Sequence, residues 1–164
     1  MPHTPFVDQF FLAITWLGSL VVLLPCSIVF GIVLVRSGRI REALLLNVGL
    51  GVTTLVVHAL KLAIKRPRPD IGNLLVAMPT DWSFPSGHAA QAAAVFFALA
   101  LIALRTFSRS AAGLIAAAGM LSTLAVGYSR VYLQVHYVSD VVAGSVVGVI
   151  AVMAVEATLR RVCR

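Results

Sequence analysis

Side chains that could carry chemistry are concentrated in three short blocks of the sequence. These are residues 61–69 (KLAIKRPRP), 85–88 (PSGH) and 129–140 (SRVYLQVHYVSD). Together they supply several cations, two imidazoles, a carboxylate and a serine–glycine turn. Groups of these kinds can neutralise the oxygens of a phosphate, attack its phosphorus and protonate a leaving oxygen. Since most of the remaining chain is hydrocarbon, function must depend on these few polar residues.

The PSGH block predicts an anion site at the start of a helix. Ser86 suits the N-cap position, and Gly87 allows a ligand to approach the backbone. The free N–H groups of a helix N-terminus attract anions, and His88 would lie in the first turn beside a bound phosphate. Taken alone, the tetrapeptide is equally consistent with a capped helix start that carries a surface histidine.

His136 and Asp140 are four residues apart in the third block. On a helix they would share one face, about 6 Å apart along the axis. The carboxylate could then fix one imidazole nitrogen and leave the other free as a nucleophile or base. The alternative is an aspartate stabilised by the helix dipole with an incidental histidine, and the pair alone favours that alternative.

Three cations, Lys61, Arg68 and Arg130, are expected at or near membrane depth. Ionisable groups are costly there and usually functional. The alternative is that they extend to lipid phosphates at the membrane surface, and we assign Lys65 and Arg66 to that role. The convergence of all three blocks favours phosphoryl transfer over the separate alternatives.

The composition predicts an integral membrane protein. The chain is 60% hydrophobic and 12% charged, with a mean hydropathy of +0.98, whereas a soluble domain is about a quarter charged. Long uncharged runs cover residues 10–35, 43–60, 82–104, 110–129 and 141–155. A spanning helix needs about 20 mostly apolar residues. We therefore predict one all-α domain, residues 1–164, with five spans at about 10–35, 43–62, 87–104, 110–128 and 139–159.

The arginines predict the orientation of these spans. One side receives eight basic residues: Arg36, Arg39, Arg41, Arg105, Arg109, Arg160, Arg161 and Arg164. The positive-inside rule places them and the C-terminus in the cytoplasm. All three blocks then face the periplasmic or extracellular side of the cell membrane. This distribution also argues that the net charge of +7 serves membrane topology and not nucleic-acid binding.

Three smaller features bear on the bundle. Cys26 and Cys163 fall in the first span and at the far C-terminus, so we predict no disulfide. The small residues at 144 and 148 (GSVVG) have the spacing that lets membrane helices approach closely. His58, three residues before Lys61, is expected to bond another helix or to support the cavity.

The three blocks resemble the signature of the type-2 phosphatidic acid phosphatase superfamily, KxxxxxxRP, PSGH and SRxxxxxHxxxD, with every fixed position matched. The resemblance covers about residues 61–144 and implies a metal-independent helical bundle. It implies that His136 is the nucleophile, Asp140 its orienting partner and His88 the general acid that later activates water. The implied phosphate-binding residues are Lys61, Arg68, Ser86, Gly87 and Arg130, supported by Ser129 and Pro85.

One departure from the family concerns the N-terminal part of the chain. Membrane members of the superfamily usually have six spans, whereas we count five, and the difference lies before the first run.

A metal site is not expected, because the nearby cations would repel Zn²⁺ from two histidines and an aspartate. No other cofactor is expected.

The expected function is hydrolysis of a phosphate monoester or pyrophosphate of a lipid within the bilayer. By resemblance, the candidate substrates are undecaprenyl pyrophosphate, phosphatidylglycerol phosphate, phosphatidic acid and phosphorylated lipid A. A lipid phosphotransferase would use the same residues. A non-catalytic protein that binds anionic lipids is the alternative from a different class. The sequence leaves the lipid and the oligomeric state open.

Overall fold

The computed structural model describes residues 4–70 and 76–162, and most of that part is helical. The helices are α1 (Pro5–Thr15), the 3₁₀ turn η1 (Trp16–Gly18), α2 (Leu20–Arg36), α3 (Ile40–Ile64), α4 (Gly87–Thr106), α5 (Arg109–Tyr132) and α6 (Val138–Val162). Helices α3 to α6 are each long and apolar enough to cross a membrane, and the bent unit of α1, η1 and α2 would make a fifth span. The chain is an all-α, multi-pass membrane protein, as predicted. Cys163 and Arg164 lie outside the described residues.

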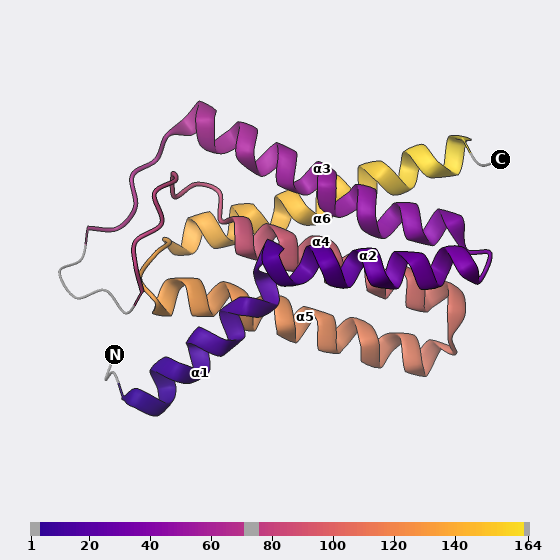
Figure 1. The fold of residues 1–164 in the computed structure, drawn as a ribbon, viewed down its shortest axis with the longest axis horizontal. Helices are drawn as coiled ribbons and strands as arrows, with labels where there is room; N and C mark the ends of the chain where they lie inside the picture. Colours follow the sequence, from indigo (N-terminus) through magenta and orange to yellow (C-terminus); the bar gives the residue numbers. More distant parts are fainter. Residues whose placement is uncertain (1–3, 71–75, 163–164) are drawn as a thin grey trace.

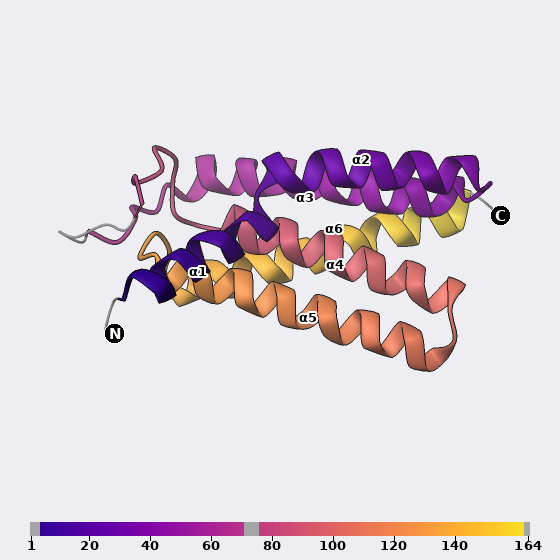
Figure 2. The same ribbon diagram turned by 60° about the horizontal axis from the view of Figure 1, so that its bottom comes forward.

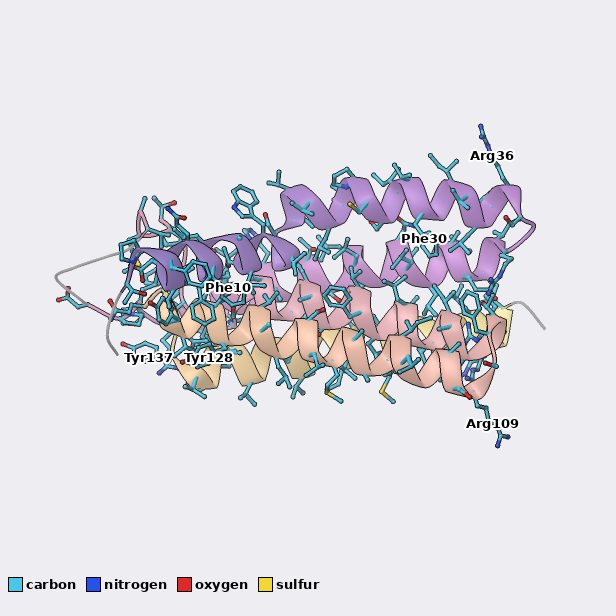
Figure 3. The ribbon with its side chains drawn as sticks, turned by 90° about the horizontal axis from the view of Figure 1, so that it is seen from below. Phe10, Phe30, Arg36, Arg109, Tyr128 and Tyr137 are labelled. Carbon is cyan, nitrogen blue, oxygen red and sulfur yellow. The ribbon has the colours of Figure 1, made fainter. Side chains whose placement is uncertain are left out.

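The helices run roughly along one axis and leave two different ends (Figure 1). The long α3–α4 connection, the α5–α6 turn and α1 gather at one end. The α2–α3 and α4–α5 turns lie at the other. Figure 3 shows Arg36 and Arg109 at that second end, with Tyr128 and Tyr137 at the first. The described arginines that are predicted to be cytoplasmic therefore lie at the end opposite to the three polar blocks.

Helix α4 is the centre of the bundle and packs against α2, α3, α5 and α6 (Figure 2). Its N-terminal half is rich in alanine, and residues 89–94 are buried. Small side chains let the neighbouring backbones approach closely. A Cβ at Gly148 would lie 2.2 Å from the Ala90 carbonyl oxygen, and one at Gly144 would lie 2.4 Å from that of Ser86. The close contact expected from the GSVVG motif is thus between α6 and α4.

The first predicted span, residues 10–35, is broken in the structure. The α1–η1 segment meets α2 at 46°, and Ser19 caps α2 through its hydroxyl, which accepts from Val21 N at 3.3 Å. The break lies where the chain approaches α4 and α5 closely. A Cβ at Gly18 would be 2.8 Å from the His88 carbonyl oxygen and 2.5 Å from Val126. A straight apolar helix could not make this approach, so hydropathy alone predicted one span where the structure has two helices.

Helix α1 packs along α5 through aromatic residues. The ring of Phe11 lies 5.2 Å from that of Tyr128 and 4.3 Å from that of Tyr132, measured between centroids. Tyr132 is buried, and its hydroxyl donates to Asp8 at 2.6 Å. This contact joins α1 to α5 next to the third polar block.

A buried ion cluster closes the opposite end of the bundle. Glu156 of α6 accepts from Arg41 of α3 at 2.7 Å, Arg105 of α4 at 2.6 Å and Arg160 at 2.6 Å. A buried carboxylate requires such pairing. One acid thereby links three helices far from the polar blocks.

Candidate active site

The three polar blocks converge on one cavity of about 310 Å³ at the first end of the bundle. Six of the predicted site residues line it, namely Lys61, Arg68, Gly87, His88, Arg130 and His136. Helices α3, α4 and α5 and the two connections beside them supply these six. Its other lining includes Leu20, Val21 and Val57, so a cationic region adjoins an apolar one.

His136 and Asp140 form the expected pair, with a different backbone arrangement. His136 lies in the turn after α5, and Asp140 lies in the first turn of α6, which begins at Val138. The two residues therefore do not share a helix face, and the expectation of a helical pair was wrong in that respect. The turn nevertheless places Nδ1 of His136 3.4 Å from Oδ2 of Asp140. An aspartate on Nδ1 fixes the tautomer that leaves the Nε2 lone pair available.

Asp140 is fully buried and has several further partners. The backbone N–H of Tyr137 donates to its Oδ2 at 3.0 Å, and the hydroxyl of Ser83 also donates to Oδ2. Arg66 pairs with its Oδ1 at 2.7 Å and lies over the ring of Tyr137, 4.1 Å from the centroid. The assignment of Arg66 to lipid was therefore wrong, and Ser83 was missed. No local pattern marks either residue, because both reach Asp140 from the α3–α4 connection.

His136 is held as a neutral ring. The side chain is buried, and Nη1 of Arg68 lies 3.3 Å from its Nε2. Burial, reinforced by this positive charge, outweighs the hydrogen bond to Asp140 and lowers the pKa of His136 to about 4. A neutral imidazole at neutral pH is the form that can attack phosphorus.

Lys61 and Arg68 both contact the same acid, Asp81. Its Oδ2 lies 2.9 Å from Nζ of Lys61, and its Oδ1 lies 2.5 Å from Nη2 of Arg68. Partial burial alone would raise the pKa of Asp81, but hydrogen bonds from Lys61 and Arg68 lower it below its ordinary value. The carboxylate is therefore charged at neutral pH. None of the three sequence blocks includes Asp81, so the sequence alone did not assign it to the site.

Arg130 approaches the cavity from α5. Its Nη1 donates to the hydroxyl of Thr15, at the end of α1, at 2.8 Å. Its Nε is buried without a hydrogen-bond partner within the described part of the chain. The broken first helix thus positions one of the phosphate-binding candidates, a role for Thr15 that the sequence did not indicate.

The PSGH block begins α4 as predicted. Ser86 is the N-cap residue, but its hydroxyl makes no capping bond and is buried without a partner in the described ranges. Its backbone N–H donates to the Asp140 carbonyl at 2.9 Å, which joins α4 to α6. Gly87 lines the cavity with its N–H in the first turn, and His88 follows it. Pro85, preceded by a cis peptide bond, is buried behind them.

Ser129 and Lys65 are not among the residues that line the cavity, and neither is Ser86. The Ser129 hydroxyl donates to the Val126 carbonyl of its own helix at 2.7 Å, which gives it a structural place behind Arg130. Lys65 caps α3 in the left-handed region, with φ of 49°. His58 lines the cavity, in keeping with the supporting place expected for it. Among residues 4–70 and 76–162, no group of three His, Cys, Asp or Glu is arranged to hold a metal ion.

The arrangement places Nε2 of His136 beside Arg68, in a cavity that Lys61, Arg130 and a second imidazole, that of His88, also line. The amino-acid sequence also matches a known protein family. A profile described as the PAP2 superfamily matches residues 42–161, more than half of the chain. The chain belongs to the PAP2 superfamily. This confirms the resemblance carried by the three blocks and the prediction of a membrane phosphatase.

PAP2 relatives match well beyond the blocks. The chain is 33% identical over 149 residues to phosphatidylglycerophosphatase B of Bacillus subtilis, covering 89% of this chain and 72% of that protein. It is 36% identical over 75 residues to an undecaprenyl-diphosphatase of Sulfolobus acidocaldarius, covering 46% of this chain and 32% of that protein.

Solved PAP2 structures share the arrangement of helices. A transmembrane PAP2-type phosphatidylglycerolphosphate phosphatase of Bacillus subtilis superposes with a TM-score of 0.88 at 30% identity, covering 97% of this chain and 79% of that one. LpxE of Aquifex aeolicus superposes with a TM-score of 0.75 at 29% identity, covering 93% and 87%.

Proposed function

We propose that this protein hydrolyses the terminal phosphate of a lipid phosphate or diphosphate through a phosphohistidine at His136. One observation carries the proposal. Asp140 engages Nδ1 of His136, while Nε2 meets Arg68 at a cavity that Lys61 and Arg130 also line. A nucleophile is thereby oriented inside a set of charges suited to phosphate oxygens.

The buried, unpartnered donors support the same site. Ser86 Oγ and Arg130 Nε make no hydrogen bond to the described residues, although buried polar groups are nearly always paired. With Lys61, Arg68 and the N-terminal N–H groups of α4, they could bind the equatorial oxygens of a phosphate. The PSGH turn supplies the backbone part of this set, and α5 supplies Arg130.

The reaction would proceed in two displacements. In the first, Nε2 of His136 forms a bond to phosphorus as the bond to the lipid oxygen breaks, and His88 protonates that oxygen. In the second, His88 accepts a proton from water, and the resulting hydroxide oxygen displaces phosphorus from Nε2. Phosphate leaves and His136 returns to its neutral form. Asp140 stabilises the positive charge that the ring carries while phosphorylated.

The apolar part of the cavity supports a lipid as the substrate. Leu20 and Val21 of α2 and Val57 of α3 adjoin the cationic residues, and Val21 is largely exposed on the surface that hydrocarbon would cover. A phosphate at His136 could therefore continue into a chain that stays in the bilayer. The named activities of the relatives, on phosphatidylglycerol phosphate and undecaprenyl diphosphate, define the first substrates to test.

The decisive experiment combines turnover with trapping of the intermediate. Purified protein in detergent micelles would be supplied with a panel of lipid mono- and diphosphates, and free phosphate would be measured without any acceptor lipid. We expect His136→Ala to lose about 1000-fold or more in kcat/KM and His88→Ala about 100-fold or more.

A radiolabelled phosphate ester of nitrophenol, whose leaving group needs no acid, should give an acid-labile phosphoenzyme. The label should accumulate in His88→Ala and be absent from His136→Ala. Phosphate release by His136→Ala at the wild-type rate would refute the proposal. If the lipid phosphate were consumed only when an acceptor lipid was present, with the phosphate found on that acceptor and not free, the protein would be a phosphotransferase. Binding of the lipid phosphate without turnover would indicate a lipid-binding protein.

A further inference from the structure

Asp81 engages the donors of two phosphate-binding candidates. Both carboxylate oxygens are used, one by Nη2 of Arg68 at 2.5 Å and the other by Nζ of Lys61 at 2.9 Å. The Asp81 side chain is 54% exposed and lines the cavity. A carboxylate that bridges two cations in this way resembles the edge of a phosphate in charge and in the placement of two oxygens.

The two cations have other anchors and do not depend on this carboxylate. Nε of Arg68 donates to the backbone oxygen of Asp81 at 2.9 Å, and its Nη1 donates to that of Val135 at 2.6 Å. Nζ of Lys61 donates to the backbone oxygen of Trp82. These carbonyls would keep both side chains in place if the carboxylate moved away, and Nη2 of Arg68 would then be free for another anion.

Asp81 also opposes a bound phosphate electrostatically. A phosphate that contacts both Lys61 and Arg68 would come within a few ångströms of the carboxylate. At such separations like charges repel, and they do so more strongly where water screens them less. Since about half of the Asp81 side chain is exposed, rotation into solvent is the simplest way to relieve this repulsion. Binding then requires the exchange of one anion for another.

We propose that the Asp81 carboxylate occupies part of the phosphate site in the free enzyme and competes with phosphate for Lys61 and Arg68. This rests on the assignment of the cavity as the phosphate site under the proposed function. Its consequence concerns product release. Lys61, Arg68 and Arg130 would together bind one inorganic phosphate tightly. The Asp81 carboxylate lowers this affinity when it returns to Lys61 and Arg68. Asp81 is thus a residue for turnover and not for chemistry at phosphorus.

The test is the affinity for inorganic phosphate, measured by calorimetry and by the shift in thermal midpoint in detergent micelles. We expect Asp81→Asn to bind phosphate about three- to tenfold more tightly than wild type, because two half-exposed ion pairs of modest strength no longer compete. The apparent KM and the inhibition constant of phosphate should fall together. Loss of a merely structural contact would instead weaken binding.

Asp70→Asn is the matched control. It removes the same charge from the same connection, at an exposed residue that makes no ion pair within the described chain. We expect its phosphate affinity to stay within about twofold of wild type, which excludes a general gain in positive potential. Asp81→Ala is compared in the same way, because the amide of Asp81→Asn could still accept a hydrogen bond from Lys61. Thermal midpoints measured without phosphate show whether each variant is folded.

Phosphate affinity that is unchanged or weaker in both Asp81 variants would overturn the proposal and make Asp81 a residue that holds the cations. An equal gain in Asp70→Asn would overturn it as well. These measurements need no turnover. If wild type released no phosphate from any lipid, the proposed function would fail while the phosphate affinities still decided the role of Asp81.

Discussion

Arg66 shows how much a single side chain adds to the His136–Asp140 pair. It contacts Asp140 across 74 positions of the sequence, and Asp140 has no exposed surface. A buried carboxylate without a cation would be strongly disfavoured. Arg66 therefore adds to the hydrogen bonds from Ser83 and Tyr137 in stabilising the charged carboxylate, which is the form that accepts a hydrogen bond from Nδ1 of His136. The neighbouring Lys65 has no such contact, although the two residues look equivalent in the sequence.

We expect Arg66→Gln to lower kcat/KM by about tenfold, since an ion pair at a partly exposed arginine is lost while Ser83 and Tyr137 still bond Asp140. Kinetics on the preferred lipid would measure it. Lys65→Asn is the matched control, because it removes one charge at a residue in the left-handed region, which asparagine tolerates. It should stay near wild type. Equal effects of the two changes would refute the role given to Arg66.

The low pKa of His136 leads to a second prediction at this scale. The ring should remain neutral from neutral pH down to about 4, because burial and Arg68 disfavour the charged form. Nitrogen-15 chemical shifts of the imidazole, assigned by comparison with His136→Asn, would follow the titration in micelles without substrate. Arg68→Gln should move the midpoint upward. A midpoint near 6.5 in wild type would contradict the buried, cation-flanked ring.

The residues that could be predicted from sequence are those whose type and spacing carry their chemistry. The PSGH turn and the histidine–aspartate pair are local, so their neighbours along the chain reveal them. Ser83, Arg66 and Asp81 belong to a connection whose path is set by tertiary contacts. Their functions depend on partners 13 to 74 positions away in the sequence. Local sequence patterns do not reveal contacts between residues so far apart.

At the scale of elements, hydropathy predicted helices well and their breaks poorly. The four later spans agree with α3 to α6 because an uncharged run of sufficient length has few other options in a membrane. The break at residues 18 and 19 depends instead on the approach of Gly18 to α4 and α5. That approach brings Thr15 to Arg130, so the break also contributes to the site.

Contact between α6 and α4 should be intolerant of added volume. Gly144→Ala would place a methyl group 2.4 Å from the Ser86 carbonyl oxygen, so α4 must shift where the anion site begins. We expect a loss of about 1–3 kcal/mol of stability from overpacking and a clear fall in kcat/KM. Thermal midpoints and phosphate release in micelles would measure both.

Gly51→Ala on α3 is the control for that substitution. Nothing lies within 4 Å of the position that its Cβ would take, and alanine is the better helix former. Its stability should be unchanged or higher, with normal kinetics. If Gly144→Ala behaved in the same way as Gly51→Ala, the close contact between α6 and α4 would not matter for the site.

In the whole molecule, the two ends of the bundle differ in how their charged side chains are paired. At one end, cations surround a cavity and share only part of their donors with acids. At the other, Glu156 is surrounded by Arg41, Arg105 and Arg160, which bind α3, α4 and α6 together. The first end leaves cationic donors unpaired, as the proposed phosphate site requires, whereas at the second end the arginines are already paired with Glu156. This division suits a protein with its chemistry on one side of the bilayer.

The positive-inside rule turns that division into a prediction of orientation. Single cysteines would be introduced by Asp70→Cys, beside the cavity end, and Arg109→Cys, at the arginine-rich end, after replacement of Cys26 and Cys163 by serine. Both positions are exposed. In intact cells, a membrane-impermeant maleimide should label Asp70→Cys. It should label Arg109→Cys only after the membrane is permeabilised. Both should react equally in detergent and retain phosphate release. Labelling of Arg109→Cys alone in intact cells would mean that the cavity opens to the cytoplasm, against the charge of the loops.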